Sequence, residues 1–371
     1  MKASSRKEGG DSVTYAEAAL LEALRNLREP SPPARVLVAG NRSGHTPLAA
    51  LEAFPGAEVA AHVFDFHHAR AMVKRLFDAD VRAARRIVRC EPSVPAGPWD
   101  LALFMTTPRS MPAELVLDQL EDILANLRPG APFLMSFEGE EADALRTVRL
   151  AYPGRVRRVA ATKRAAVFMV RGPESPLPRR SFAAEWTASL PGRPPETFVS
   201  YPGCFCHRRA DAGGLALAEV AARSLKPGAA ILDMGCGSGL VGILLAKALA
   251  AAHPENPGSL VMVDSHARAI AAARENAARA GLENVRFVLS DTGLPRGETA
   301  VCDVLAGNPP YYSEYKIAET FLSTAYVALR PGGLCHTVVK TASGLLPVQE
   351  KYFRKAETTM RRGYAVLTSV R

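Results

Sequence analysis

Four consecutive residues could hold a flat, amine-bearing ring: Asn308, Pro309, Pro310 and Tyr311. They follow an apolar run, residues 301–307, that predicts a buried strand. Two prolines in a row end a strand, because neither can donate to a sheet ladder. The Asn308 side-chain oxygen and the Pro309 carbonyl can each accept a hydrogen from an exocyclic amine, and the Tyr311 ring can stack. The motif therefore predicts binding of a planar group such as a nucleobase flipped out of its stack.

A glycine-rich turn lies upstream, between a predicted strand at residues 229–232 and a predicted helix at 240–252. Such a turn lets the backbone approach a ligand at the helix N-terminus. Further strands are expected at 259–263 and 285–289, each followed closely by an aspartate. Because parallel strands end at one edge of a sheet, these groups and the residue 308 motif should meet there. The candidate residues are Asp233, Gly235, Cys236, Gly237, Gly239, Asp264, Ser265 and Asp291.

These motifs resemble those of class I S-adenosylmethionine-dependent methyltransferases, and more narrowly the small-subunit ribosomal RNA guanine-N2 methyltransferases. Residues 201–205 and 210–214 resemble the segment that this family places before its first strand. Residues 329–333 resemble its turn before the fifth strand, and residues 362–367 its last hairpin. The resemblance covers about residues 196–371.

The resemblance implies an α/β fold, with a Rossmann-like domain whose mostly parallel seven-stranded sheet carries helices on both faces. It implies S-adenosylmethionine as the methyl donor, with Asp233 orienting the amino end and Asp264 accepting the ribose hydroxyls. Asp291 would contact the adenine amino group. Asp211 and Gly213 lie in the segment that resembles the family's cofactor lid. Asn308 is expected beside both the cofactor and the target base.

Methyl transfer to an exocyclic amine requires positioning more than acid–base chemistry. The amine is a weak nucleophile, and accepting its hydrogens at Asn308 and Pro309 would favour a positively charged transition state. Residue 311 is more often Phe in guanine-N2 enzymes, whereas Tyr is commoner in adenine-N6 and glutamine-N5 methyltransferases. Both activities therefore remain alternatives, as does a non-catalytic RNA-binding assembly factor. Residues 237–242 also fit the GxGxxG pattern of dinucleotide oxidoreductases, but that motif is weak.

The first half of the chain repeats the order of the second half. Residues 36–40 align with 231–235, and residues 127–130 align with 329–332, at offsets of about 200 residues. Asp65 aligns with the aspartate at 264. The pattern predicts two tandem Rossmann-like domains that arose by duplication.

The first copy lacks the residues that would do chemistry. Val38 stands where the second copy has aspartate, and Arg42 stands where it has a glycine that must approach the cofactor closely. Residues 105–108 replace the Asn-Pro-Pro-Tyr motif. Guanine-N2 ribosomal RNA methyltransferases carry such a degenerate N-terminal domain, so the resemblance implies a non-catalytic first copy.

Composition and proline content predict the domain boundaries. Residues 1–14 are polar and are expected to be a disordered tail. Residues 15–172 would form the degenerate methyltransferase-like domain, and residues 196–371 the catalytic one. Residues 173–195 contain six prolines and are expected to be a stiff linker.

The formal net charge of +9 is compatible with a polyanionic partner, here ribosomal RNA or the small ribosomal subunit. Basic clusters could contact phosphates, although a solvated surface explains any single one of these residues equally well. The candidates are Arg82, Arg85, Arg86, Arg89, Arg155, Arg157, Arg158, Lys163, Arg164, Arg179 and Arg180.

The six cysteines include no CxxC pair, which indicates reduced thiols and a cytoplasmic protein. The segment 204–207 holds two cysteines and a histidine, but no second ligand cluster accompanies it, so no metal is expected. No apolar run approaches the ~20 residues of a membrane span. A monomer is expected.

Overall fold

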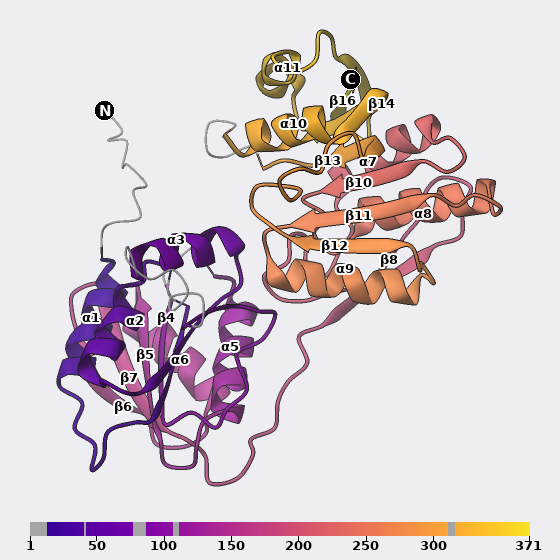
Figure 1. Cartoon of the computed structure of the whole chain (residues 1–371). Coiled ribbons are helices and arrows are strands. Elements are labelled where there is room, and N and C mark those ends of the chain that lie inside the picture. Colours follow the sequence, from indigo (N-terminus) through magenta and orange to yellow (C-terminus); the bar gives the residue numbers. More distant parts are fainter. Residues whose placement is uncertain (1–12, 41, 77–86, 107–110, 311–315) are drawn as a thin grey trace. The chain divides into compact units, whose positions relative to one another are not determined.

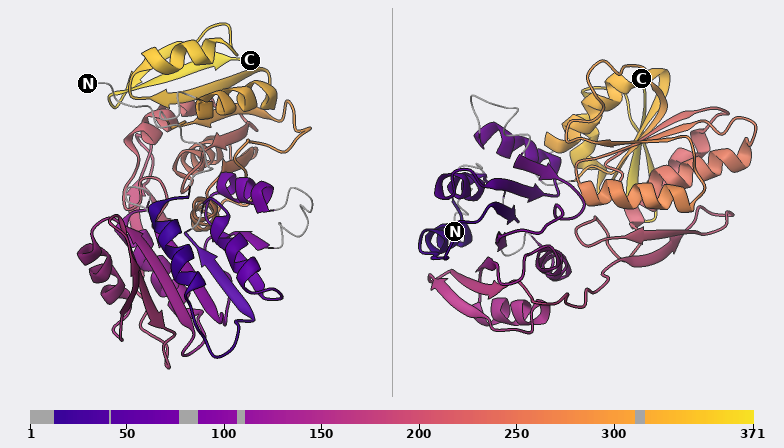
Figure 2. Two further views of the ribbon diagram at one scale, coloured as in Figure 1. Left: turned by 90° about the vertical axis from the view of Figure 1, so that its left-hand side faces the viewer. Right: turned by 60° about the horizontal axis from the view of Figure 1, so that its bottom comes forward.

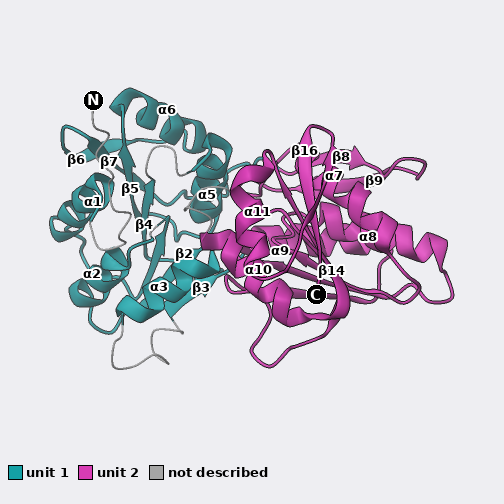
Figure 3. Cartoon of the chain, turned by 90° about the horizontal axis from the view of Figure 1, so that it is seen from above, with its two compact units in different colours: residues 1–182 teal, residues 183–371 magenta. Residues whose placement is uncertain are grey.

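The computed structural model describes most of the chain, namely residues 13–40, 42–76, 87–106, 111–310 and 316–371. The chain forms two compact units, Met1–Phe182 (unit 1) and Ala183–Arg371 (unit 2; Figure 3). The division falls inside the stretch 173–195 that the sequence predicts as a linker. Strand β8 (Ala184–Ala188) occupies part of that stretch and pairs antiparallel with β9 (Glu196–Ser200).

Unit 1 is a seven-stranded sheet in the order β3-β2-β1-β4-β5-β7-β6. The pairs among β1 to β5 are parallel, and β7 is antiparallel to both β5 and β6. The strands are β1 (Arg35–Ala39), β2 (Glu58–Val63), β3 (Val88–Cys90), β4 (Leu101–Thr106), β5 (Pro132–Glu138), β6 (Arg157–Ala161) and β7 (Ala165–Arg171). The helices are α1 (Tyr15–Arg25), α2 (His45–Ala53), α3 (Phe66–Leu76), α5 (Ala113–Ala125) and α6 (Glu141–Ala151).

Unit 2 contains a second seven-stranded sheet, ordered β12-β11-β10-β13-β14-β16-β15 (Figure 1). The strands are β10 (Ala230–Met234), β11 (Ser259–Asp264), β12 (Val285–Leu289), β13 (Cys302–Gly307), β14 (Leu329–Val339), β15 (Glu357–Arg361) and β16 (Tyr364–Val370). The helices are α7 (Ala212–Ala221), the 3-10 turn η1 (Ala222–Ser224), α8 (Leu240–Ala252), α9 (Ala267–Arg279), α10 (Lys316–Ala328) and α11 (Ala342–Glu350). Strand for strand, this order matches that of unit 1, which confirms the predicted pair of Rossmann-like domains.

Each sheet is covered by helices on both faces (Figure 2), because alternate side chains of a strand point to opposite sides. In β10, Ile231 packs into the apolar cluster that contains α7 and α8 residues, whereas Leu232 packs into the cluster with α10 residues. Both side chains are fully buried, and burying one such side chain stabilises the fold by about 1.5–3 kcal/mol. The central strands therefore bury apolar side chains on both faces.

One predicted turn is wrong in its extent. Residues 329–333 are predicted to precede the fifth strand, but they lie within β14, where Leu329 pairs with Cys302 and Leu334 pairs with Val304. The β14 segment between these two pairs is longer than the β13 segment that it faces, so its extra residues bulge out of the ladder. Pro331 has no N–H to donate, and Gly332 adopts a φ of 81° that a side chain would disfavour.

Candidate active site

The parallel pairing of unit 2 brings the predicted groups to one edge of the sheet. Met234, the last residue of β10, is in register with Val263 of β11 and with Gly307 of β13. Asp264 ends β11, and Asn308 directly follows β13. The glycine-rich turn that follows β10 therefore lies between these two side chains, as the sequence predicts.

The glycine-rich turn is open where a ligand would approach it. Gly237 has a φ of 54°, and a Cβ atom built on it would meet no atom within 4 Å. Gly239 has a φ of 89° and directly precedes α8. The backbone conformation favours glycine at both positions, and the open side of Gly237 leaves room for close approach of a ligand.

Asp264 fixes this turn to the neighbouring strand. Its Oδ2 accepts a hydrogen bond from Gly237 N and its Oδ1 one from His266 N, each at 2.8 Å. A carboxylate has about four lone-pair sites, and the sequence assigns the ribose hydroxyls to this one. The structure adds a second task, holding the glycine-rich turn in place.

Asp233 lies behind the turn rather than beside the ligand space. It is 2% exposed, and its Oδ2 accepts a 2.8 Å hydrogen bond from Gly242 N in the first turn of α8. Burial raises the pKa of Asp233 to about 7, opposed by the Gly242 hydrogen bond and reinforced by the nearby charge of Asp264. Its observed contact ties β10 to α8.

Asp211 joins the start of α7 to the Asn-Pro-Pro-Tyr motif. Its Oδ2 accepts from Gly214 N at 2.6 Å, as the N-cap of α7, and from Asn308 Nδ2 at 2.8 Å. The Asn308 amide nitrogen therefore faces Asp211, and its oxygen points in a different direction within the amide plane. An orientation set by a charged acceptor is strongly held.

A hollow between α7, α8 and the turn collects part of the predicted set. Predicted residues in its lining are Asp211, Gly235, Cys236, Gly237 and Asn308. The remaining described candidates do not line the hollow; they are buried Gly213, Asp233, Gly239 and Pro309, and half-buried Asp264, Ser265, Asp291 and Pro310. Tyr311 lies outside the described residues.

Several lining residues were missed by the sequence analysis. Phe205 is 67% exposed, and it lines the hollow with Cys206, Arg209 and Trp186. Trp186 comes from β8, in the stretch expected to be linker, and stacks on Phe198 of β9 with ring centroids 4.7 Å apart. The sequence signal for this hairpin is the alternation of polar and apolar residues near a Pro-Gly pair. The high proline content of the stretch concealed this signal.

The residues present fit S-adenosylmethionine. The open backbone at Gly237 suits the close approach of the methionine part. The carboxylates of Asp211, which lines the hollow, and of Asp264, which accepts from Gly237 N, suit its ammonium and hydroxyl donors. The side chain of Asn308 lies in the same hollow as the glycine-rich turn. The Asn308 amide and the glycine-rich turn are thus adjacent.

Protein side chains contact the equivalent turn of unit 1. Arg75 Nη1 donates to the carbonyl of Ser43 at 2.7 Å, and the Ser43 hydroxyl donates to the buried Glu17 at 2.6 Å. Protein side chains thus engage a turn that, in unit 2, faces the ligand hollow.

Some basic residues expected to contact phosphate are paired with carboxylates. Arg179 lies 3.0 Å from Asp122, and Arg180 pairs with Glu121. Arg158 pairs with Glu141 at 3.1 Å, and exposed residues of this set include Arg89, Arg155, Arg157 and Lys163. Arg82, Arg85 and Arg86 lie outside the described residues.

Within the described ranges, no helix combines the length and apolar character needed to cross a membrane. In the same part of the chain, no group of three His, Cys, Asp or Glu side chains is placed to hold a metal ion.

Comparison with known proteins relates unit 2 to a methyltransferase family. Residues 196–368 match the family model of the methyltransferase small domain. The chain is 27% identical over 285 residues to ribosomal RNA small subunit methyltransferase C of Stutzerimonas stutzeri, covering 75% of this chain and 81% of that protein. The protein of the same name from Pseudomonas aeruginosa is 28% identical over 279 residues, covering 73% and 78%. Ribosomal RNA large subunit methyltransferase G of Streptomyces avermitilis is 32% identical over 169 residues, covering 44% and 41%.

One solved structure matches nearly the whole chain. It is the T. thermophilus 16S rRNA N2 G1207 methyltransferase in complex with AdoMet and guanosine. The TM-score is 0.74 at 21% identity, and the match covers 95% of this chain and 91% of that chain. The likeness shows a common fold across both units.

Proposed function

We propose that this chain, whose residues 196–368 belong to the methyltransferase small domain family, methylates the exocyclic amine (N2) of a guanine in small-subunit ribosomal RNA. Bound S-adenosylmethionine would supply an electrophilic methyl group. The names of the relatives that share most of this chain's length support the RNA substrate. The solved structure that matches both units is of an N2 methyltransferase, which supports the target atom.

The contact between Asp211 and Asn308 carries this proposal. Since the amide nitrogen is held by the carboxylate, the amide oxygen is presented as an acceptor to the target amine. An amine conjugated with its ring gains positive charge as it attacks, so an acceptor fixed in advance stabilises the transition state more than the ground state. Asp211 and Asn308 also position the amine relative to the methyl donor, which supplies the entropic part of catalysis.

We assign the cofactor to unit 2 and RNA recognition, without catalysis, to unit 1. The contacts that Arg75 and Glu17 make with Ser43 in the equivalent turn support the absence of a cofactor there. Exposed Arg89, Arg155 and Arg157 could contact phosphates. The enzyme would act as a monomer in the cytoplasm, on free ribosomal RNA or on the small subunit.

The direct test incubates the purified chain with S-adenosylmethionine and an in vitro transcript of small-subunit ribosomal RNA. Mass spectrometry of the nucleosides should detect N2-methylguanosine. Asn308→Ala should lose about 10²–10³-fold in rate, the scale of removing one preset transition-state hydrogen bond. Asn284→Ala is the matched control, since Asn284 is an exposed amide that bonds the carbonyl of Gly258.

Two alternatives would give different outcomes. N6-methyladenosine in the product would replace the guanine assignment, and methylation of a protein glutamine would replace the RNA substrate. An unmethylated product together with tight RNA binding would indicate a non-catalytic assembly factor.

A further inference from the structure

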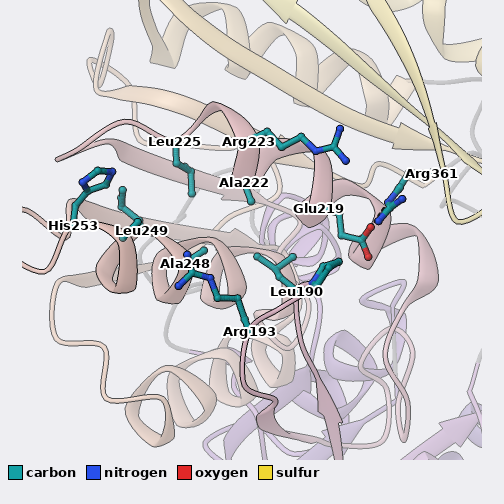
Figure 4. A pocket seen from close by; sticks show the side chains of 12 residues that line it. Leu190, Arg193, Glu219, Ala222, Arg223, Leu225, Ala248, Leu249, His253 and Arg361 are labelled. Carbon is teal, nitrogen blue, oxygen red and sulfur yellow. Dashed lines mark hydrogen bonds and ion pairs between the residues drawn. The ribbon is translucent and has the colours of Figure 1, made fainter.

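Unit 2 contains a cavity of about 320 Å³ outside the candidate active site (Figure 4). It lies among α7, α8, the β8–β9 loop and the end of β15, and none of the predicted site residues lines it. Its wall is partly apolar and partly cationic. The residues are Leu190, Pro191, Arg193, Glu219, Ala222, Arg223, Leu225, Ala248, Leu249, Ala252, His253 and Arg361.

Arg193 is presented by a tight turn. Its backbone N–H donates to the Leu190 carbonyl at 3.0 Å, with Pro191 and Gly192 between them and a φ of 75° at Gly192. Proline followed by a glycine of positive φ is typical of a type II turn. Leu190 is buried in the core of unit 2, so the turn is anchored while Arg193 is exposed.

A second tight turn supplies Arg361. Arg361 pairs with Tyr364 across the β15–β16 hairpin, and the two residues between them, Arg362 and Gly363, have φ values of 50° and 74°. Such values are those of a two-residue type I′ turn. Arg361 and Arg362 both turn their Nε atoms toward the carboxylate of Glu219.

Glu219 does not make this cavity acidic. Although burial opposes its charge, hydrogen bonds from Arg362 and Arg361 hold the pKa of Glu219 below its usual value. Its side chain is 2% exposed, whereas that of Arg361 is 40% exposed. The single carboxylate of the wall is thus neutralised and covered, and it fixes two guanidinium groups whose outer nitrogens remain toward solvent.

Two further guanidinium groups add to this charge. Arg193 and Arg223 are both exposed, and neither has a side-chain partner among the residues that the structure describes. With Arg361 they give the cavity three cations against one neutralised carboxylate. Leu225 and Leu249 form an apolar floor on the side of the cavity near His253 (Figure 4).

Helix α7 runs from the active site to the cavity. Asp211 is its N-cap at the active site, and Glu219 lies eight residues later at the cavity. At 1.5 Å per residue, these two residues are about 12 Å apart along the helix.

We propose that this cavity binds backbone phosphate groups of the RNA substrate next to the target nucleotide. The inference rests on the proposed function. Guanidinium groups bind phosphate oxygens in a planar, two-pronged manner, and the apolar floor would pack against the adjoining sugar and base. Phosphate contacts would set the register of the RNA, while the Asn308 motif selects the base.

The test measures binding of a fluorescein-labelled transcript of small-subunit ribosomal RNA by fluorescence anisotropy between about 50 and 200 mM KCl. Arg193→Gln combined with Arg223→Gln should weaken binding on the order of tenfold, the sum of two solvent-facing ion pairs. The salt slope should shrink by about 1.4, or 0.7 per lost contact to single-stranded RNA. Arg354→Gln with Lys355→Gln removes the same charge from another exposed site and should leave both values near wild type.

Equal RNA affinity and equal salt slope for the two double variants would overturn the proposal. Weakened binding of polyglutamate with unchanged RNA binding would also overturn it, because the cavity would then serve an acidic protein. S-adenosylmethionine affinity, measured by calorimetry, should be equal in all variants and shows that unit 2 is folded. Methylation by the wild-type chain is scored separately, so a failure of the proposed function is distinguishable from a failure of the phosphate site.

Discussion

Replacing Asp211 with Ser should affect its two contacts unequally, although both are made by the same oxygen, Oδ2. Serine is as good an N-cap as aspartate, so the bond to Gly214 N can be kept. The serine hydroxyl is shorter and uncharged, so the charge-assisted bond to Asn308 Nδ2, 2.8 Å long in the structure, is lost. We therefore expect Asp211→Ser to loosen the Asn308 amide while leaving α7 intact.

The magnitude follows from the bond that is lost. A hydrogen bond to a charged group contributes about 1.5–3 kcal/mol, so kcat should fall roughly 10–150-fold at 1.4 kcal/mol per factor of ten. Asp211→Ala loses the cap as well, which costs about 1 kcal/mol of stability. For a unit of about 190 residues that corresponds to roughly 2–4 °C in Tm. Asp211→Asn keeps an acceptor of lower charge and should fall between Ser and wild type in kcat.

The assay is transfer of a tritiated methyl group to saturating RNA, with S-adenosylmethionine affinity measured by calorimetry. Asp65→Ser is the matched control, because Asp65 accepts from His67 N at the start of α3 in unit 1. Wild-type kcat for Asp211→Ser would refute the positioning role. Weaker cofactor binding with unchanged kcat would instead assign Asp211 to the cofactor, as the sequence alone suggested.

Three further predictions concern other parts of unit 2. Asp264→Ala should weaken S-adenosylmethionine binding in calorimetry, because it loses the ribose acceptor and the anchor of the glycine-rich turn, whereas Asp65→Ala should not; unchanged affinity would sink the assignment. Tyr311→Phe should be mild in steady-state methyl transfer and Tyr311→Ala severe, since stacking contributes about 1–3 kcal/mol per base; equal rates would argue against stacking. The free energy of unfolding, measured by chemical denaturation between about pH 4 and 6.5, depends on pH with a certain slope. Relative to wild type, Asp233→Asn and His336→Gln should change this slope in opposite directions.

The opposite signs follow from two buried groups. The pKa of Asp233 is raised from 3.8 to about 7, so the folded state keeps a proton that the unfolded state has lost, and this contribution to stability falls as pH rises. Burial lowers the pKa of His336 from 6.5 to about 4, so its contribution falls as pH drops. Each of these two groups changes the free energy of unfolding by up to ~1.4 kcal/mol per pH unit. Asp233→Asn should therefore make the slope more positive and His336→Gln more negative; parallel curves would contradict both assignments.

Sequence alone predicted the elements that depend on local pattern. The apolar runs at residues 229–232 and 301–307 predicted β10 and β13, and the glycines predicted the turn at Gly237. Hydrophobic periodicity and glycine content are local properties of the sequence. The repeated order of elements was visible for the same reason, and the two sheets share one strand order. The meeting of the site residues at one edge of the unit 2 sheet could be predicted, because the carboxyl ends of parallel strands lie at the same edge.

Contacts between distant residues could not be predicted. Asp211 and Asn308 are 97 positions apart, and only the packing of α7 against the sheet brings them together. Trp186 was hidden in a proline-rich stretch, where Pro191 in fact shapes a hairpin turn. Arg179 was a candidate for phosphate, yet the fold places it beside Asp122, a pairing that charge counting cannot reveal.

Production of N2-methylguanine in small-subunit ribosomal RNA is the activity on which the other assignments depend. Nucleoside mass spectrometry of that RNA, purified from cells with and without the gene, tests it most directly. We expect that one N2-methylguanosine is lost when the gene is deleted, returns with the wild-type chain and does not return with Asn308→Ala. An unchanged nucleoside profile, or the loss of a methyl group from a ring carbon or a ribose oxygen, would contradict this activity.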